Sequence, residues 1–130
     1  MALLCSLMCS LTRAETVHLD RGRLQMLYRQ MGETGAETVI TRACRELAAR
    51  LMRCDRLWRL EDWGATRKCA RSIIAIAEQI GMEDLARVAR DVTVAADRHD
   101  PIALAATLAR LQRIGRASLR AVWRLRGVVV

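Results

Sequence analysis

Aromatic residues and proline are scarce in this sequence of 130 residues. It contains three Trp, one Tyr, no Phe and a single Pro. Strands favour aromatic side chains and proline interrupts helices, so this shortage argues against a β-sheet protein and for long, uninterrupted helices. A chain of this length forms one hydrophobic core more readily than two. We therefore expect one all-α domain.

The sequence also has few of the features that mark secretion, membrane insertion or metal binding. No apolar run approaches the ~20 residues that a spanning helix needs. Residues 1–11 are apolar, but they have no basic start and no cleavage site follows, so we interpret residues 1–18 as an N-terminal tail. The cysteines at positions 5, 9, 44, 54 and 69 are odd in number and form no CxxC pair, which predicts reduced thiols, a cytoplasmic protein and no metal site.

Acidic residues are outnumbered by basic ones, 14 against 22, which gives a formal net charge of +8. Nearly all of the positive charge is arginine, whose guanidinium group suits carboxylates and phosphates. The excess favours an acidic partner. The alternative is that these arginines only solvate the outer faces of helices.

The spacing of apolar residues predicts five helical segments. A short one runs from Asp20 to Met31, with Gly32 as its stop, and the capping box Thr34-Gly35-Ala36-Glu37 starts a long helix that ends near residue 60. Asp62 is placed to cap a third helix that reaches Ile80, a fourth covers 82–97, and Asp100-Pro101 starts the last, which continues to Leu125.

Four of these helices are amphipathic, similar in length and joined by short connections. Such helices bury their apolar faces together by packing as antiparallel neighbours. We therefore expect an antiparallel up-down four-helix bundle over residues 19–126, with the short N-terminal helix as an accessory element that covers one end.

Residues 69–81, CARSIIAIAEQIG, resemble the signature of histidine-phosphotransfer (Hpt) domains, which is roughly A-H-x-L-K-G-x-A-x-x-[LIV]-G. Ala70, Ile73, Ala75 and the pair at 80–81 match its scaffold positions. The segment Glu61-Asp62-Trp63 and the stretch 85–90, LARVAR, also resemble the sequence on either side of that signature. The likeness covers about residues 19–125.

Two residues depart from the pattern, since Arg71 stands at the phosphorylated histidine and Ile74 at the neighbouring lysine. In the family, an imidazole nitrogen attacks the aspartyl phosphate of a receiver domain. A guanidinium group offers no lone pair for that attack. His18 and His99 lie outside the middle of any predicted helix, and we interpret both as surface or capping residues.

The resemblance therefore implies a protein that binds a response-regulator receiver domain or a histidine kinase without accepting phosphate. The sequence has no Ser/His/Asp set, paired catalytic carboxylates, phosphate-binding Gly loop or metal-ligand spacing, so we expect neither an enzyme nor a cofactor. Arg71 would be an unreactive cation in the receiver's acidic pocket. The alternative is that Arg71 only lies in solvent on an inherited fold. The predicted partner-binding residues are Arg67, Lys68, Arg71, Ile74, Ala75 and Glu78.

A basic stripe on the last predicted helix supports a different function. Its arginines recur at steps of three and four, at Arg113, Arg116, Arg120 and Arg124. They suit nucleic acid or an acidic protein, although arginines near a helix C-terminus also complement the helix dipole. Nucleic acid is the less favoured partner, because no recognition motif accompanies the charge. A helical oligomerisation module anchored by Trp58, Trp63 and Trp123 is a further alternative, and the sequence leaves the oligomeric state open.

Overall fold

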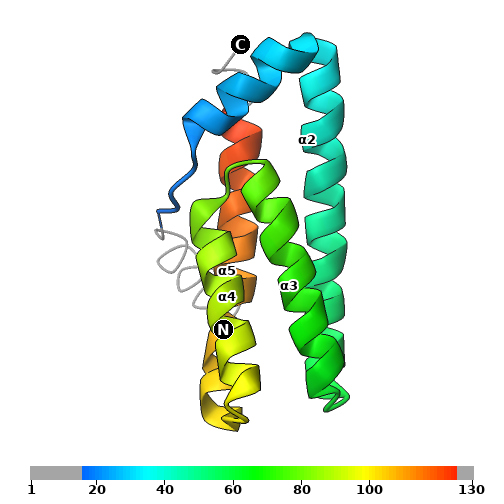
Figure 1. Ribbon diagram of the computed structural model, residues 1–130, viewed down its shortest axis with the longest axis vertical. Coiled ribbons are helices and arrows are strands. Elements are labelled where there is room, and N and C mark those ends of the chain that lie inside the picture. Colours follow the sequence, from blue (N-terminus) through cyan, green and yellow to red (C-terminus); the bar gives the residue numbers. More distant parts are fainter. Residues whose placement is uncertain (1–15, 126–130) are drawn as a thin grey trace, which may run out of the picture.

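The computed structural model describes residues 16–125 and shows an antiparallel four-helix bundle (Figure 1). Its helices are α2 (Arg21–Arg59), α3 (Trp63–Gln79), α4 (Glu83–Asp97) and α5 (Pro101–Leu125). Each helix packs on the next along the chain, and α5 also packs on α2. The predicted all-α fold is confirmed. Residues 1–15 of the expected tail, with Cys5 and Cys9, and residue 126 lie outside the described residues.

A kink at Gly32 divides α2 into two sections. Gly32 has φ 73° and ψ 173°, and it is the residue of α2 whose backbone angles are not helical. The section before Gly32 crosses the top of the bundle in Figure 1, and the section after it descends beside α3. The expected short helix thus covers one end of the bundle, and α2 breaks at the glycine that the sequence marked as a stop.

Aspartates determine where three of the helices begin. The carboxylate of Asp20 accepts a hydrogen bond from the backbone N–H of Arg23 at 3.1 Å. Asp62 and Asp100 accept in the same way from the residues three positions later, each at 3.0 Å. These bonds satisfy N–H groups that a first helical turn leaves without an intrahelical partner, which is why the predicted starts of α3 and α5 are correct within about a residue.

The core lies between the inner faces of the four helices. Gly115 allows α5 to approach α2 closely, because a Cβ atom at this position would lie 2.5 Å from Leu51 Cδ1. Beside it, Gln112 Nε2 donates a hydrogen bond to the backbone oxygen of Leu51 at 2.8 Å. The largest side chains that are completely buried are Leu24, Ile40, Leu47, Ile73, Ile80, Met82, Leu85, Leu104, Leu111, Val88, Val92 and Val122.

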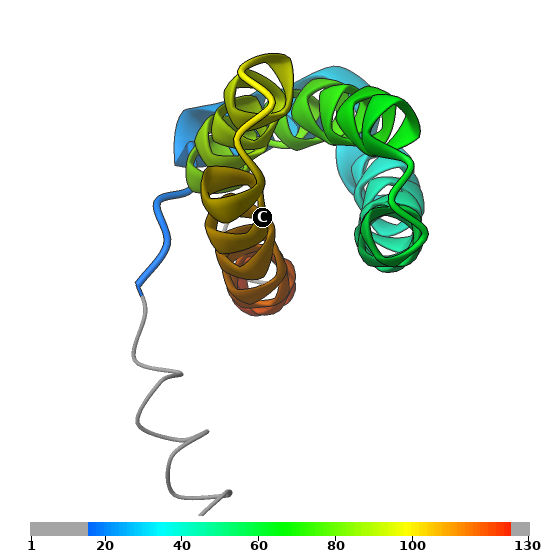
Figure 2. The ribbon, with the colours of Figure 1, turned by 90° about the horizontal axis from the view of Figure 1, so that it is seen from below.

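The two helix pairs, α2 with α3 and α4 with α5, separate toward the end opposite the kinked section (Figure 2). A cleft of about 670 Å³ there is lined by Trp58, Arg59, Glu61, Trp63 and Pro101. The two tryptophan rings lie 6.1 Å apart and are tilted by 32°. Both indoles are half-buried, so they close this end of the core while leaving part of each ring in the cleft.

Candidate functional site

The predicted partner surface lies on α3. Arg71 is exposed near the middle of this helix, and Lys68 and Ala75 are exposed one turn to either side of it. Ile74 is half-buried and packs against the core, so it contributes only part of its side chain to the surface. The helical period explains this arrangement, since Ala70, Ile73 and Ala77 occupy the opposite, buried face.

Arg67 and Glu78, at the two ends of the predicted surface, form ion pairs with α4. The guanidinium of Arg67 binds Asp97 through two bonds, Nε to Oδ1 at 2.5 Å and Nη2 to Oδ2 at 3.4 Å. Glu78 pairs with Arg90. These two residues therefore connect α3 to α4, a role that the sequence did not indicate because it depends on how the two helices align.

Arg71 and Lys68 have no ion pair or hydrogen-bonding partner for their side chains within residues 16–125. On the neighbouring helix, Val94 lies between the two α4 residues that bind α3, and 45% of its surface is exposed. The α3–α4 surface, which we define as Lys68, Arg71, Ile74, Ala75 and Val94, thus combines two available cations with small and apolar side chains. This chemistry suits a partner that presents an acidic group beside an apolar patch.

The four arginines of the predicted basic stripe, Arg113, Arg116, Arg120 and Arg124, are all exposed on α5. Arg110 is exposed one turn earlier, and the sequence of α5 contains no Asp or Glu. No carboxylate on α5 itself can therefore form an i,i+3 or i,i+4 ion pair with these arginines. The geometry is therefore compatible with a second surface for an anionic partner.

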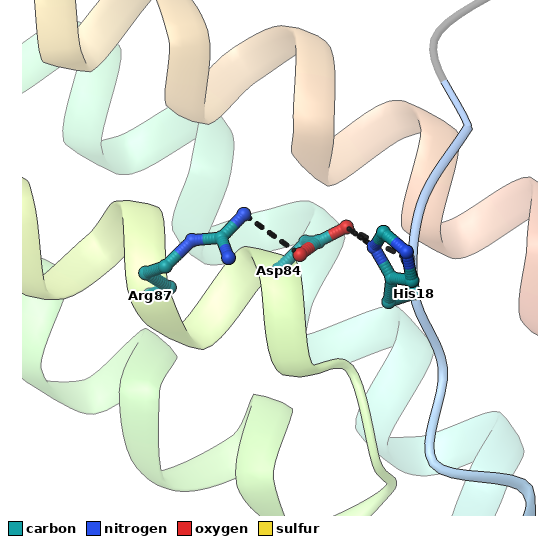
Figure 3. Close-up of polar contacts among 3 residues, drawn as sticks. All are labelled: His18, Asp84 and Arg87. Atoms are coloured by element: carbon teal, nitrogen blue, oxygen red, sulfur yellow. Dashed lines mark hydrogen bonds and ion pairs between the residues drawn. The ribbon is translucent and has the colours of Figure 1, made fainter.

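A buried carboxylate that sequence analysis missed lies at the start of α4 (Figure 3). Only 8% of the Asp84 side chain is exposed. Its Oδ2 accepts hydrogen bonds from the backbone N–H of His18 at 2.7 Å and from the His18 ring at Nδ1 at 3.0 Å. Its Oδ1 accepts from Arg87 Nη2 at 2.8 Å.

Burial alone would raise the pKa of Asp84, but the two hydrogen bonds from His18 and the charge of Arg87 outweigh it and lower the pKa below 3.8. The carboxylate is therefore ionised at neutral pH and can only accept, so His18 Nδ1 must carry a hydrogen. The other ring nitrogen, Nε2, is left as the acceptor in the neutral ring, on a side chain that is 78% exposed.

Together these bonds hold residues 16–20 against the turn between α3 and α4. Leu19 forms an antiparallel bridge with Met82, and the backbone N–H of Asp20 donates to the oxygen of Gly81 at 2.8 Å. Gly81 has φ 77°, and a Cβ atom there would lie 2.8 Å from the Asp20 oxygen. The glycine that ends α3 thus also makes room for the segment that enters the bundle.

Within residues 16–125, no group of three or more His, Cys, Asp or Glu residues is arranged to hold a metal ion. None of the helices in that part of the chain combines the length and apolarity needed to span a bilayer. Comparison of the chain with protein-family models, with curated proteins and with solved structures gave no match. The fold and the α3–α4 surface therefore identify only the class of protein. It is an all-α four-helix bundle with exposed cationic faces.

Proposed function

We propose that this protein is an Hpt-like member of a phosphorelay that binds a response-regulator receiver domain or a sensor kinase without accepting a phosphoryl group. The observation that carries the proposal is the position of Arg71. It is exposed and has no partner among the described residues, at the α3 position where the resemblance expects the reactive histidine.

The charge of the α3–α4 surface supports a carboxylate-rich partner. Lys68 and Arg71 lie one turn apart on α3, while the neighbouring Arg67 already has Asp97 as its counter-ion. A guanidinium group can bind a carboxylate through two parallel hydrogen bonds, and this geometry gives specificity as well as attraction. Arg71 can therefore enter an acidic pocket as a cation that cannot react there.

The shape of the surface supports close contact. Ala75 is exposed one turn after Arg71, and its small side chain allows another helix or loop to approach the α3 backbone. Ile74 and Val94 contribute partly exposed apolar area beside it. An apolar centre next to a charged group is the usual composition of a specific protein interface.

The experiment that tests this proposal is a binding titration of the full chain against purified receiver domains and histidine-kinase domains from the same host. We expect Arg71→Ala to weaken binding by about tenfold, which corresponds to ~1.4 kcal/mol. The matched control is Arg42→Ala, since Arg42 is also exposed but lies on α2. If no receiver or kinase domain binds, or if both variants weaken binding equally, the proposal is wrong.

A second candidate function rests on α5, whose arginines face solvent on a helix without carboxylates. By this hypothesis the α5 stripe binds nucleic acid or an acidic protein. We expect duplex DNA or RNA to bind at low salt, with log K falling by about 0.9 for each phosphate contact per unit of log salt.

In the double variant Arg116→Ala, Arg120→Ala, the slope of log K against log salt should become shallower. The change should correspond to the loss of about two phosphate contacts, since each arginine neutralises about one phosphate. Arg71→Ala is the matched control on α3 and should leave the slope unchanged. Absence of binding even at low salt would exclude nucleic acid as the partner of α5 and leave the acidic protein to be tested.

A further inference from the structure

Two cysteines on neighbouring helices face each other between α2 and α3. The thiol of Cys54, on α2, donates to the backbone oxygen of Thr66 on α3 at 3.9 Å. The thiol of Cys69, on α3, lies 3.3 Å from the backbone oxygen of Arg50 on α2, to which it donates in its protonated form. Thr66 lies one turn before Cys69 on α3, and Arg50 lies one turn before Cys54 on α2, so each thiol reaches the opposite helix beside the other cysteine. This geometry brings the two sulfurs together between the helices, although 15 positions separate the residues in the sequence.

The surroundings of the two thiols make them chemically different. Cys54 is completely buried, whereas 7% of the surface of Cys69 is exposed. The neighbouring Cys54 thiol and the charges of Arg53 and Arg50 outweigh the effect of burial and lower the pKa of Cys69 to about 7. The neighbouring Cys69 thiol and burial raise the pKa of Cys54. Cys69 is thus the nucleophile of the pair, because it is the more exposed thiol and the nearby arginines favour its reactive thiolate form.

We propose that Cys69 and Cys54 form a site of reversible oxidation by hydroperoxides, in which Cys69 reacts first and Cys54 resolves the product into a disulfide between α2 and α3. The thiolate of Cys69 attacks one oxygen of hydrogen peroxide, forming a sulfenic acid and releasing hydroxide. The sulfur of Cys54 then displaces the hydroxyl group as water. Overall, two thiols and one peroxide give one disulfide and two waters.

The third cysteine of the bundle provides a contrast. Cys44 is also buried on α2, but it lies six positions before Arg50, whose backbone oxygen Cys69 contacts. That separation is about 9 Å along a helix that rises 1.5 Å per residue, which is too far for a disulfide between Cys44 and Cys69 without a shift of one helix along the other. Solvent access also favours reaction at Cys69, because hydrogen peroxide is close to water in size and Cys69 is the more exposed thiol of the pair.

The disulfide would join α3 to α2 at the level of Arg71 but on the opposite side of α3, because Cys69 is two positions before Arg71 and faces α2. A covalent link between α2 and α3 fixes the register of the helix that carries the α3–α4 surface. The oxidation site nevertheless depends only on the arrangement of the thiols, so its test is independent of the function proposed above.

The test uses the full chain, titrated with hydrogen peroxide, alkylated and digested after Lys and Arg. We expect the peptide 54–56, CDR, to appear joined to the peptide 69–71, CAR, with the loss of two hydrogens. A thiol reductant should separate them. Cys44→Ala is the matched control, and it should leave this linkage unchanged.

Two variants separate the roles of the thiols. In Cys54→Ala, Cys69 should stop at the sulfenic acid and be trapped by dimedone. In Cys69→Ala, Cys54 should stay unmodified under the same conditions. Circular dichroism of each variant would verify that the helices are retained.

The rate at which iodoacetamide alkylates Cys69 in the native chain gives a second readout that needs no substitution. It should rise to half its maximum near pH 7. The inference is overturned if the native, folded protein oxidises only at other cysteines, or if Cys54 reacts as fast as Cys69.

Discussion

The native protein is expected to take no phosphoryl group from a phosphorylated receiver domain, whereas the double variant Arg71→His, Ile74→Lys is expected to take it. The guanidinium of Arg71 stays protonated and has no lone pair with which to attack an acyl phosphate. An imidazole at the same exposed position would have one. The lysine would add a cation beside the transferred phosphoryl oxygens. The measurement is acid-labile radiolabel on the protein after incubation with labelled receiver.

The structure makes this substitution reasonable on steric grounds. Position 71 is exposed, and both neighbours on its face, Lys68 and Ala75, leave it accessible from solvent. Position 74 is half-buried at the edge of the core, so a lysine there can pack its methylene groups and extend its ammonium group outward. The single variant Arg71→His tests whether the lysine is needed, and we expect weaker labelling from it.

His18 requires its own control. Its ring is exposed, and Asp84 orients it with Nδ1 protonated, an arrangement that also suits a nucleophile. All variants should therefore be compared in a His18→Gln background. Label on the native protein that disappears in His18→Gln would identify His18 as the acceptor, and label that persists would identify another nucleophile such as His99. Either result would contradict the proposal that the protein accepts no phosphoryl group. Failure of the double variant to accept label, while it remains folded and binds the receiver, would contradict the resemblance itself.

Features encoded within a few residues of each other were predictable from the sequence. Asp62 and Asp100 cap the helices that follow them, and Gly32 breaks the first long run, because capping and positive φ depend on local chemistry. The exposure of Arg71 follows from the same logic, since the 3.6-residue period assigns Ala70 and Ile73 to the core. Four helices with apolar faces, joined by short turns, can bury those faces together by packing as an antiparallel bundle.

Features that depend on the alignment of distant segments were not predictable. His18 and Asp84 are 66 positions apart, and nothing in the sequence distinguishes Asp84 from an ordinary acidic residue in the first turn of a helix. The ion pair between Arg67 and Asp97, and the contacts that the thiols of Cys54 and Cys69 make across the α2–α3 boundary, depend on how far one helix is shifted along another. A shift of one turn, about 5.4 Å, would remove all of these contacts without changing the apolar pattern.

Among these long-range contacts, the carboxylate of Asp84 is expected to contribute most to stability. Asp84→Asn keeps the shape of the side chain but replaces one acceptor oxygen with a donor, which then faces either His18 or Arg87. We expect the free energy of unfolding at pH 7 to fall by about 3 kcal/mol, because hydrogen bonds to a buried charged group contribute roughly 1.5–3 kcal/mol each. Asp91→Asn is the matched control, since Asp91 is exposed on the same helix, and urea titration followed by circular dichroism measures both.

The pH dependence separates the charge of Asp84 from its shape. Because the folded state lowers the pKa of Asp84 below 3.8, its stabilisation is fully present above that value and is lost as the pH falls through the folded pKa. The native protein should therefore lose stability steeply below about pH 4, and Asp84→Asn should lose less over the same interval. Equal acid sensitivity in both proteins would show that the contacts from His18 and Arg87 do not depend on the charge of Asp84. Residues 16–20 would then be held mainly by the backbone bonds to Gly81 and Met82 rather than by the carboxylate.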